Sequence, residues 1–250
     1  MSIIEKLATV VDVEQLKKDS DINFGEYFVD NRFSFTDEMF RGRALLDIGA
    51  NIGIFSLFAW AQGAGPIVAI ESNSVNFQKL CDNTKKIENI VPVHCAAFNG
   101  VDMDAVVVED GGVSKVAPAT VQLGGERVPC KSLAELLDRM PAKDDDMFLK
   151  VDIEGAEYDF LIYAAAKDIR RFRTVFLETH LIAPKGERCG GSPLEPCRAR
   201  TADFLLEYMK FVGYEVARRD AYCWWTWDNG KVVDYQELPD QYSYRLERKR

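Results

Sequence analysis

The sequence predicts an α/β fold in which a mostly parallel central sheet carries helices on both faces. From Ala44 onward, short apolar runs alternate with segments of helical periodicity, a pattern typical of successive βαβ units. A glycine-containing turn joins the first apolar run to the first helical segment, as in open parallel sheets. The 250 residues suit one large α/β domain. We therefore expect a main domain over residues 44–250 and an extension over residues 1–43.

The N-terminal extension is expected to be helical and aromatic and to pack on the main domain. Ile3, Leu7, Val10 and Leu16 recur at near-helical intervals, which predicts one amphipathic helix over residues 3–18. A less regular aromatic stretch follows, over residues 24–40.

The main domain contains regular elements that follow from its apolar pattern. Short apolar runs predict strands at residues 44–48, 67–71, 91–94, 147–152 and 174–179. Helical periodicity predicts helices at residues 52–62, 75–86, 133–139, 157–166 and 202–211.

Two segments depart from this alternation. Residues 101–130 contain valine-rich runs separated by Gly111-Gly112 and Gly124-Gly125, which predicts an inserted antiparallel hairpin. Residues 214–233 resemble two antiparallel strands that close the sheet edge, with Asp228-Asn229-Gly230 as their turn.

Charge and composition exclude several classes of partner and location. Forty acidic residues against 31 basic ones give a net charge of -9, which disfavours nucleic acid and anionic membrane surfaces as partners. The first twenty residues mix charges with single apolar residues, unlike a secretory signal, so a cytoplasmic location is expected. The six cysteines form no C-x-x-C pair, and we expect thiols.

The turn after the first predicted strand is the principal candidate for a ligand site. It reads Asp47-Ile48-Gly49-Ala50-Asn51-Ile52-Gly53. Gly49 is expected to let the backbone approach a ligand, and Gly53 to let the following helix lie close to the strand. Asn51 is expected to cap that helix. Asp47 suits a ligand that carries an ammonium group.

A carboxylate at the end of the second predicted strand strengthens this assignment. Glu71 follows the turn by about 20 residues, the spacing at which an acid binds ribose hydroxyls in this kind of fold. Ser72 beside it and Ala97 beyond the third strand complete the expected lining of the cofactor site. Asn51 replaces the second glycine of the dinucleotide motif G-x-G-x-x-G, which disfavours a pyrophosphate and hence an NAD-dependent oxidoreductase.

Three motifs together resemble the FkbM-type S-adenosylmethionine-dependent methyltransferases. They are the sequences at residues 45–53, 69–71 and 150–157, and the similarity extends from Leu45 to His180. The resemblance implies a class I methyltransferase fold, which is Rossmann-like, with S-adenosylmethionine as cofactor. It also implies methylation of a hydroxyl on a small-molecule acceptor such as a sugar or natural product. Residues 1–43 and 183–250 lie outside it, and we expect acceptor specificity there.

The acceptor side of the site is expected at the ends of the fourth and fifth predicted strands. Asp152 ends an apolar strand and therefore needs a partner or a ligand, so we expect it on both the cofactor and the catalytic side. Glu154 and His180 are the other candidate catalytic residues, since an imidazole with an ordinary pKa of about 6.5 exchanges protons near neutral pH. Glu154 and Glu157 also suit the start of a helix, where the macrodipole favours carboxylates.

Several alternatives remain at this stage. Asp152, Glu154, Glu178 and His180 could gather a divalent metal, although the sequence favours a site without one. An N- or carboxyl-methyltransferase and a catalytically silent binding module are further hypotheses. Outside the motifs, we expect Trp224, Trp225 and Trp227 to pack or to stack on the acceptor, and the loop Ala183–Arg200 to present positive charge. A bridge or shared metal at Cys189 and Cys197 is disfavoured.

Overall fold

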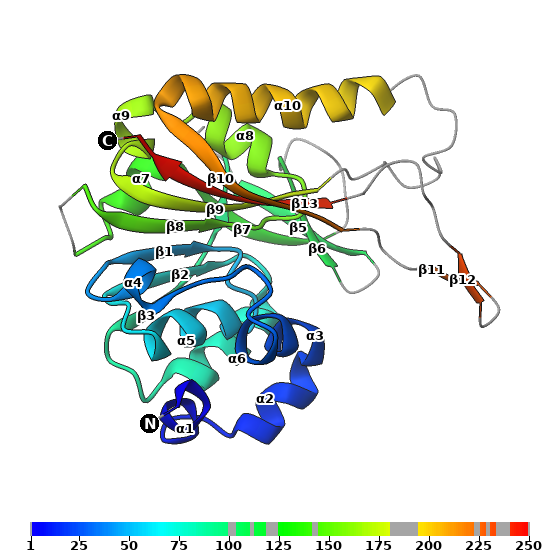
Figure 1. Ribbon diagram of the computed structural model, residues 1–250. Helices are drawn as coiled ribbons and strands as arrows, with labels where there is room; N and C mark the ends of the chain where they lie inside the picture. Colours follow the sequence, from blue (N-terminus) through cyan, green and yellow to red (C-terminus); the bar gives the residue numbers. More distant parts are fainter. Residues whose placement is uncertain are drawn as a thin grey trace.

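The computed structural model describes residues 2–99, 104–110, 113–118, 125–141, 145–180, 195–222, 226–228, 231–233 and 241–249. A seven-stranded sheet crosses the molecule, with helices on both of its faces (Figure 1). Its strand order is β10-β13-β9-β8-β1-β2-β3. This architecture confirms the predicted α/β class.

The central sheet is parallel except for one strand. Its parallel strands are β1 (Leu45–Ile48), β2 (Ile67–Glu71), β3 (Ile90–His94), β8 (Met147–Val151) and β9 (Phe172–His180). β13 (Gln241–Arg248) runs antiparallel between β9 and β10 (Tyr214–Tyr222). The strand order reverses between β1 and β8, and open sheets of this type bind ligands beyond the carboxyl ends of their strands at such a point.

The helices form one layer on each face of the sheet (Figure 1). One layer consists of α5 (Ile54–Ala61), α6 (Ser74–Thr84) and the N-terminal helices. The opposite layer consists of α7 (Leu133–Leu137), α8 (Glu157–Ile162), α9 (Ala166–Ile169) and α10 (Glu195–Val212). Because both faces are covered, all residues of β1, β2 and β8 are buried, which explains why these strands read as continuous apolar runs.

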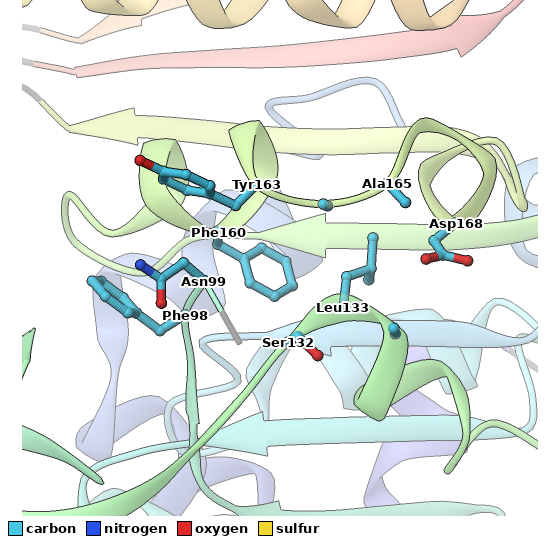
Figure 2. A pocket seen from close by; sticks show the side chains of 10 residues that line it. Phe98, Asn99, Ser132, Leu133, Phe160, Tyr163, Ala165 and Asp168 are labelled. Atoms are coloured by element: carbon cyan, nitrogen blue, oxygen red, sulfur yellow. The ribbon is translucent and has the colours of Figure 1, made fainter. Parts of the chain in front are cut away.

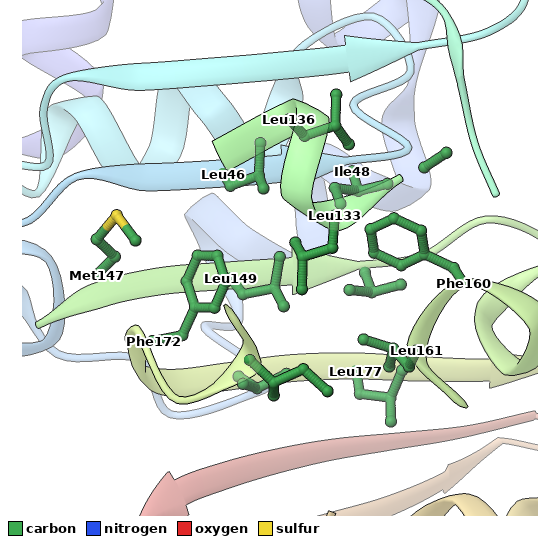
Figure 3. Close-up of a cluster of buried hydrophobic side chains, with 14 of the residues drawn as sticks. Leu46, Ile48, Leu133, Leu136, Met147, Leu149, Phe160, Leu161, Phe172 and Leu177 are labelled. Atoms are coloured by element: carbon green, nitrogen blue, oxygen red, sulfur yellow. The ribbon is translucent and has the colours of Figure 1, made fainter. Parts of the chain in front are cut away.

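Two hydrophobic clusters hold the layers together. In the first, Leu46, Leu149 and Leu177 project from neighbouring strands toward the covering helices, where Leu133 and Phe160 meet them (Figure 3). In the second, aromatic residues of the N-terminal segment pack against α5 and the other sheet face. The carboxyl ends of the strands are thereby fixed between two close-packed layers.

The N-terminal segment differs from the single helix expected over residues 3–18. It forms α1 (Ile3–Ala8), α2 (Val13–Asp19), α3 (Asp21–Phe24), a π-helix η1 (Gly25–Val29) and α4 (Asp37–Phe40). The apolar periodicity continues across the break, but Asp12 accepts a hydrogen bond of 3.1 Å from the Gln15 amide and so starts a new helix. A local cap therefore outweighs the periodicity.

The inserted hairpin is confirmed, and it belongs to a second sheet. β5 (Asp104–Asp110) pairs antiparallel with β6 (Val113–Pro118) and with β7 (Glu126–Lys131), which pairs parallel with β4 (Ala96–Ala97). The expected turn at Gly111-Gly112 lies outside the described residues.

The C-terminal strands are arranged differently from the prediction. β11 (Thr226–Asp228) and β12 (Lys231–Val233) pair antiparallel as expected, but they form a separate ribbon instead of closing the main sheet. The antiparallel partner of β10 is β13, for which we predicted no strand. Tyr244 and Leu246 are buried in β13 and alternate with Arg245 and Glu247, an apolar–polar alternation typical of a strand that the prediction overlooked.

Among the residues that the structure describes, no helix has the length and apolar character needed to cross a membrane.

Candidate active site at the carboxyl ends of the strands

The turn after β1 has the left-handed backbone that its glycines suggest. Gly49 has φ +78°, and a Cβ built on it would lie 1.7 Å from the carbonyl oxygen of Asp152. Glycine is therefore required because the loops after β1 and β8 approach each other at this position. The sequence had suggested a different reason, the approach of a ligand to the backbone. Gly53, at φ +93°, would place a Cβ 2.8 Å from Leu80, so the close packing at this glycine is against α6 and not between helix and strand as the sequence suggested.

The expected helix cap at Asn51 is wrong. α5 begins at Ile54 with Gly53 as its N-cap, and Asn51 takes a left-handed φ of +52°. Its amide donates a 2.8 Å hydrogen bond to Oε2 of Glu71 instead. The turn is thus tied to the end of β2.

Glu71 is buried, with 5% of its surface exposed, and both of its oxygens accept backbone hydrogen bonds. Oε1 accepts from the Asn73 amide at 2.7 Å, and Oε2 from Asn51. Burial raises the pKa of this carboxyl, while the two amides oppose the rise. The Ser72 backbone also hydrogen-bonds to this carboxylate, so of its roughly four acceptor positions one remains for a ligand hydroxyl.

The remaining residues expected to line the cofactor site lie at nearby strand ends. Ala50 is buried, and its amide bonds to the carbonyl of Ile70 at 2.8 Å. The Ser72 carbonyl lies 3.0 Å from Nε2 of His94, whose ring stacks on Phe77. Ala97 lies in β4 and packs in the first hydrophobic cluster.

Asp47 is fully buried beneath the turn and only partly satisfied. Ser56 donates a 2.6 Å hydrogen bond to Oδ2, whereas Oδ1 has no hydrogen-bond partner. Nζ of Lys150 lies 3.7 Å from that orphaned oxygen. Burial raises the pKa of Asp47, and Lys150 and Ser56 oppose the rise.

Lys150 links the two sides of the site, a role that sequence reasoning missed. Its Nζ donates to the carbonyl of Gly49 at 2.7 Å and lies 3.0 Å from Oδ2 of Asp152. Burial lowers the pKa of Lys150, but Asp152 and Asp47 outweigh this effect and raise the pKa overall. The sequence did contain a signal for this role, because a lysine within an apolar strand is buried and its ammonium group requires carboxylate partners.

Asp152, Glu154 and His180 come together as the sequence predicted. Nε2 of His180 lies 3.7 Å from Oδ1 of Asp152 and 3.5 Å from Oε2 of Glu154. On its other side, Nδ1 is 2.8 Å from Oε1 of Glu157. Glu157 is fully buried and accepts hydrogen bonds from the amides of Ile153 and Gly155. This buried carboxylate therefore orients both the imidazole and the loop that carries Glu154.

The charge states in this cluster differ from the sequence expectation. Burial lowers the pKa of His180, but Glu157, Asp152 and Glu154 outweigh it and raise the pKa to about 10. The three surrounding carboxylates therefore favour a positive charge at this position. Burial raises the pKa of Glu154 to about 7, although His180 opposes the rise.

The N-terminal segment also contributes groups that the sequence did not reveal. Glu26 and Tyr27 of η1 lie close enough to Asp152 for its charge to raise their pKa values, in addition to the larger effect of burial. No motif in residues 1–43 marks Glu26 or Tyr27, because their proximity arises from the packing of η1.

Glu178 of β9 is buried beside Asp152 and His180, and burial and Asp152 raise its pKa.

A separate cavity of about 180 Å³ lies behind the strand ends, between β4 and helices α7 to α9. Figure 2 shows Phe98, Asn99, Phe160 and Tyr163 gathered around it. Its volume is below the roughly 300 Å³ of ordinary ligand pockets. The cluster of polar side chains at the carboxyl ends of the strands remains the candidate site.

Other predicted features fall outside the part of the chain that is described. They include Trp224, Trp225, Cys189 and residues 183–194 of the expected basic loop. Residues 195–200 of that loop form the start of α10, so this part is helical.

The sheet order, with a single antiparallel strand, and the polar site at the ends of β1, β2 and β8 define a class I methyltransferase fold. The model of the methyltransferase FkbM domain matches residues 47–216, which is more than half of the chain. The chain belongs to this family and is an S-adenosylmethionine-dependent methyltransferase.

Solved structures with similar folds have low sequence identity to this chain. A methyltransferase FkbM from Methylobacillus flagellatus is 15% identical, with a TM-score of 0.46, and the alignment covers 89% of this chain and 47% of that one. A SAM-dependent methyltransferase from Aquifex aeolicus is 14% identical, with a TM-score of 0.45 and coverage of 96% and 100%. A putative RNA methyltransferase from Pyrococcus horikoshii is 13% identical, with a TM-score of 0.44 and coverage of 92% and 82%. No curated protein sequence matches the chain.

Proposed function

We propose that this methyltransferase transfers the methyl group of S-adenosylmethionine to a hydroxyl of a small polar molecule, such as a sugar or a natural product. The observation that carries the proposal is the position of Asp152. One of its oxygens pairs with Lys150, which reaches the Gly49 turn, and the other faces His180 and Glu154. A cofactor side and an acceptor side thus share one residue.

The cofactor side is assigned to the turn after β1 and the end of β2. We assign cofactor contacts to Asp47, Gly49, Ala50, Asn51, Gly53, Glu71, Ser72, Ala97 and Asp152. The residues fit the cofactor's chemistry: Glu71 keeps an acceptor position for a ribose hydroxyl, and the carboxylate of Asp47 beneath the turn favours an ammonium group held through a water. Bound S-adenosylmethionine supplies a methyl group activated on a sulfonium sulfur.

The acceptor side is assigned to Asp152, Glu154 and His180. Methyl transfer requires the acceptor oxygen in line with the methyl group, and positioning of this kind contributes about 7–11 kcal/mol. The buried Glu157 fixes the orientation of the His180 imidazole, so this ring would already be positioned when the acceptor binds. A carboxylate of this cluster would accept the hydroxyl proton as a general base, an effect worth roughly 10²–10⁴-fold in rate.

Charge supports a small acceptor over nucleic acid. The net charge of -9 repels a phosphate backbone, and the cluster at the acceptor side is rich in carboxylates. We also propose that the protein acts in the cytoplasm, away from membrane surfaces.

The test is a panel of acceptors incubated with S-adenosylmethionine, with release of S-adenosylhomocysteine as the readout. We expect turnover with hydroxylated small molecules and none with RNA or carboxylic acids. Asp152→Asn and His180→Ala should each reduce turnover. If both variants work at the parental rate, the assigned acceptor side is wrong, and turnover with RNA alone would overturn the substrate class.

A further inference from the structure

Three donor atoms at the acceptor side face one another across a gap. Nε2 of His180 lies 3.7 Å from Asp152 and 3.5 Å from Glu154, and one ligand atom from each residue lies within 4.8 Å of the others. These distances are longer than a hydrogen bond. The three groups therefore converge without bonding directly to one another.

The size of the gap suits a metal ion. Ligand atoms bound about 2.1 Å from one ion lie about 3.0 Å apart in octahedral geometry and about 3.4 Å apart in tetrahedral geometry. The separations of 3.5 and 3.7 Å from His180 are slightly wider than these values, and the three ligand atoms lie within 4.8 Å of one another. The side chains of Asp152 and Glu154 would therefore have to rotate inward to bring all three atoms into coordination distance.

The histidine is buried and aimed as a metal ligand would be. His180 is 7% exposed, and its Nδ1 is held at 2.8 Å by the buried carboxylate of Glu157. A carboxylate behind the imidazole is the usual support of metal-bound histidine, because it fixes the ring and its tautomer. Within the described residues, Nε2 makes no hydrogen bond and points toward the two carboxylates.

Asp152 has an oxygen to spare for the same purpose. Its Oδ2 pairs with Lys150 at 3.0 Å, while Oδ1 faces His180. Glu154 follows on a loop that is itself anchored by Glu157. Three ligands thus come from the ends of two neighbouring strands, β8 and β9.

We propose that Asp152, Glu154 and His180 bind one divalent cation of the Mn²⁺ class, with Mg²⁺ bound more weakly. The cation replaces the Nε2 proton of His180, which is released to water. Carboxylates suit Mg²⁺ and Mn²⁺, whereas the imidazole favours a transition metal. Three protein ligands leave open positions, and, given the proposed function, an acceptor oxygen takes one of them. The bound cation lowers the pKa of that hydroxyl, whose proton leaves to water while the oxygen stays on the metal.

The test uses the full chain, stripped with a chelator and titrated with Mn²⁺ alone. Free Mn²⁺ is measured by electron paramagnetic resonance. We expect one ion per chain, with binding weakened about tenfold or more in Glu154→Gln and in Asp152→Asn. Glu14→Gln, an acid on the surface of α2, is the matched control and should bind as the parent does.

A second readout identifies the imidazole directly. Spin-echo modulation from a ¹⁴N nucleus should accompany bound Mn²⁺ in the parent and vanish in His180→Gln. Equal Mn²⁺ binding by the parent and Glu154→Gln, or a parent complex without the nitrogen modulation, would overturn the metal site. Affinity for S-adenosylmethionine, measured with chelator present, tests the cofactor side separately, so failure of one proposal is distinguished from failure of the other.

Discussion

Gly49 shows how one residue without a side chain sets the geometry of the site. Its hydrogen takes the place where a Cβ would overlap the carbonyl of Asp152, and its φ of +78° is costly for any other residue. The cofactor turn and the acceptor-side loop therefore approach each other only if this position is glycine.

Gly49→Ala is expected to lower the free energy of unfolding by about 2 kcal/mol or more, because it adds both overlap and left-handed strain. Chemical denaturation measures the change. Gly25→Ala is the matched control, since Gly25 has helical φ and ψ and open space around its Cα. This control should be neutral or slightly stabilising. Similar losses in both variants would show that the close approach is not the cause.

The buried Lys150 is the second residue on which the site depends. Lys150→Met would leave the Asp47 carboxylate buried without its ammonium partner, and breaking a buried pair costs about 3–5 kcal/mol. Denaturant titration should show this loss, with partial recovery when Asp47→Asn is added. Lys85→Met, an exposed lysine of a surface pair, should change stability by less than about 0.5 kcal/mol. The hypothesis fails if the two lysine variants behave alike.

At the scale of elements, strands and helices were predicted chiefly where a pattern is local. β1, β2 and β8 are buried on both faces and therefore read as apolar runs. β13 was missed although Arg245 and Glu247 alternate with its buried residues, which is a local strand signal; only its place between β9 and β10 depends on packing. One helix was predicted over residues 3–18 because the apolar periodicity continues across Asp12. The prediction is wrong because the cap at Asp12 starts a new helix.

Helix α7 offers a pH-dependent test of a local cap. Ser132 and Glu135 form a capping box, and Lys131 lies 2.7 Å from Oε1 of Glu135. The Lys131 hydrogen bond and the Ser132 amide lower the pKa of Glu135 to about 2. Because the pKa is lower in the folded state, the charge stabilises the fold above about pH 4.5, and this contribution fades as pH falls toward 2.

Glu135→Gln keeps an acceptor for the cap but removes the charge. Near pH 7, we expect it to destabilise the protein by less than about 1 kcal/mol, since Glu135 is 41% exposed and solvent screens the pair. The difference from the parent should shrink between pH 4.5 and pH 3 in unfolding measurements. A difference that is constant over this range would exclude the charge as its source.

At the scale of the whole molecule, the N-terminal segment shares a core with the sheet. Phe35 contacts rings from three parts of the chain, among them Phe40, Phe58 and Phe176, and is 2% exposed. The division into an extension over residues 1–43 and a domain over residues 44–250 remains a prediction, and this shared core argues against independent folding of the second part.

Phe35→Ala is expected to cost about 3–5 kcal/mol, because it opens a cavity between the segment and the sheet. Phe204→Ala on α10, at a site that is 57% exposed, is the control and should cost less than about 0.5 kcal/mol. Thermal unfolding compares the two. A folded, cooperative fragment of residues 44–250 would contradict the shared core.

Much of the candidate site could be predicted because it lies at strand ends that local sequence marks. Glu71 and Asp152 each close an apolar run, and Asp47 lies one residue before the end of β1; a turn or loop follows each strand. Lys150, Glu157 and Glu26 could not be assigned in this way. Their roles depend on which loops meet in space, and that follows from the order of β8 and β9 and from the packing of η1.

The central claim is that the turn after β1 and Glu71 together bind S-adenosylmethionine. Calorimetry with S-adenosylmethionine and with NADH measures this most directly, on the parent, on Glu71→Gln and on Glu88→Gln, an exposed acid that serves as control. We expect micromolar-range binding of S-adenosylmethionine and none of NADH, with most of the affinity lost in Glu71→Gln and retained in Glu88→Gln. Tight binding of NADH, or parental affinity for S-adenosylmethionine in Glu71→Gln, would contradict the claim.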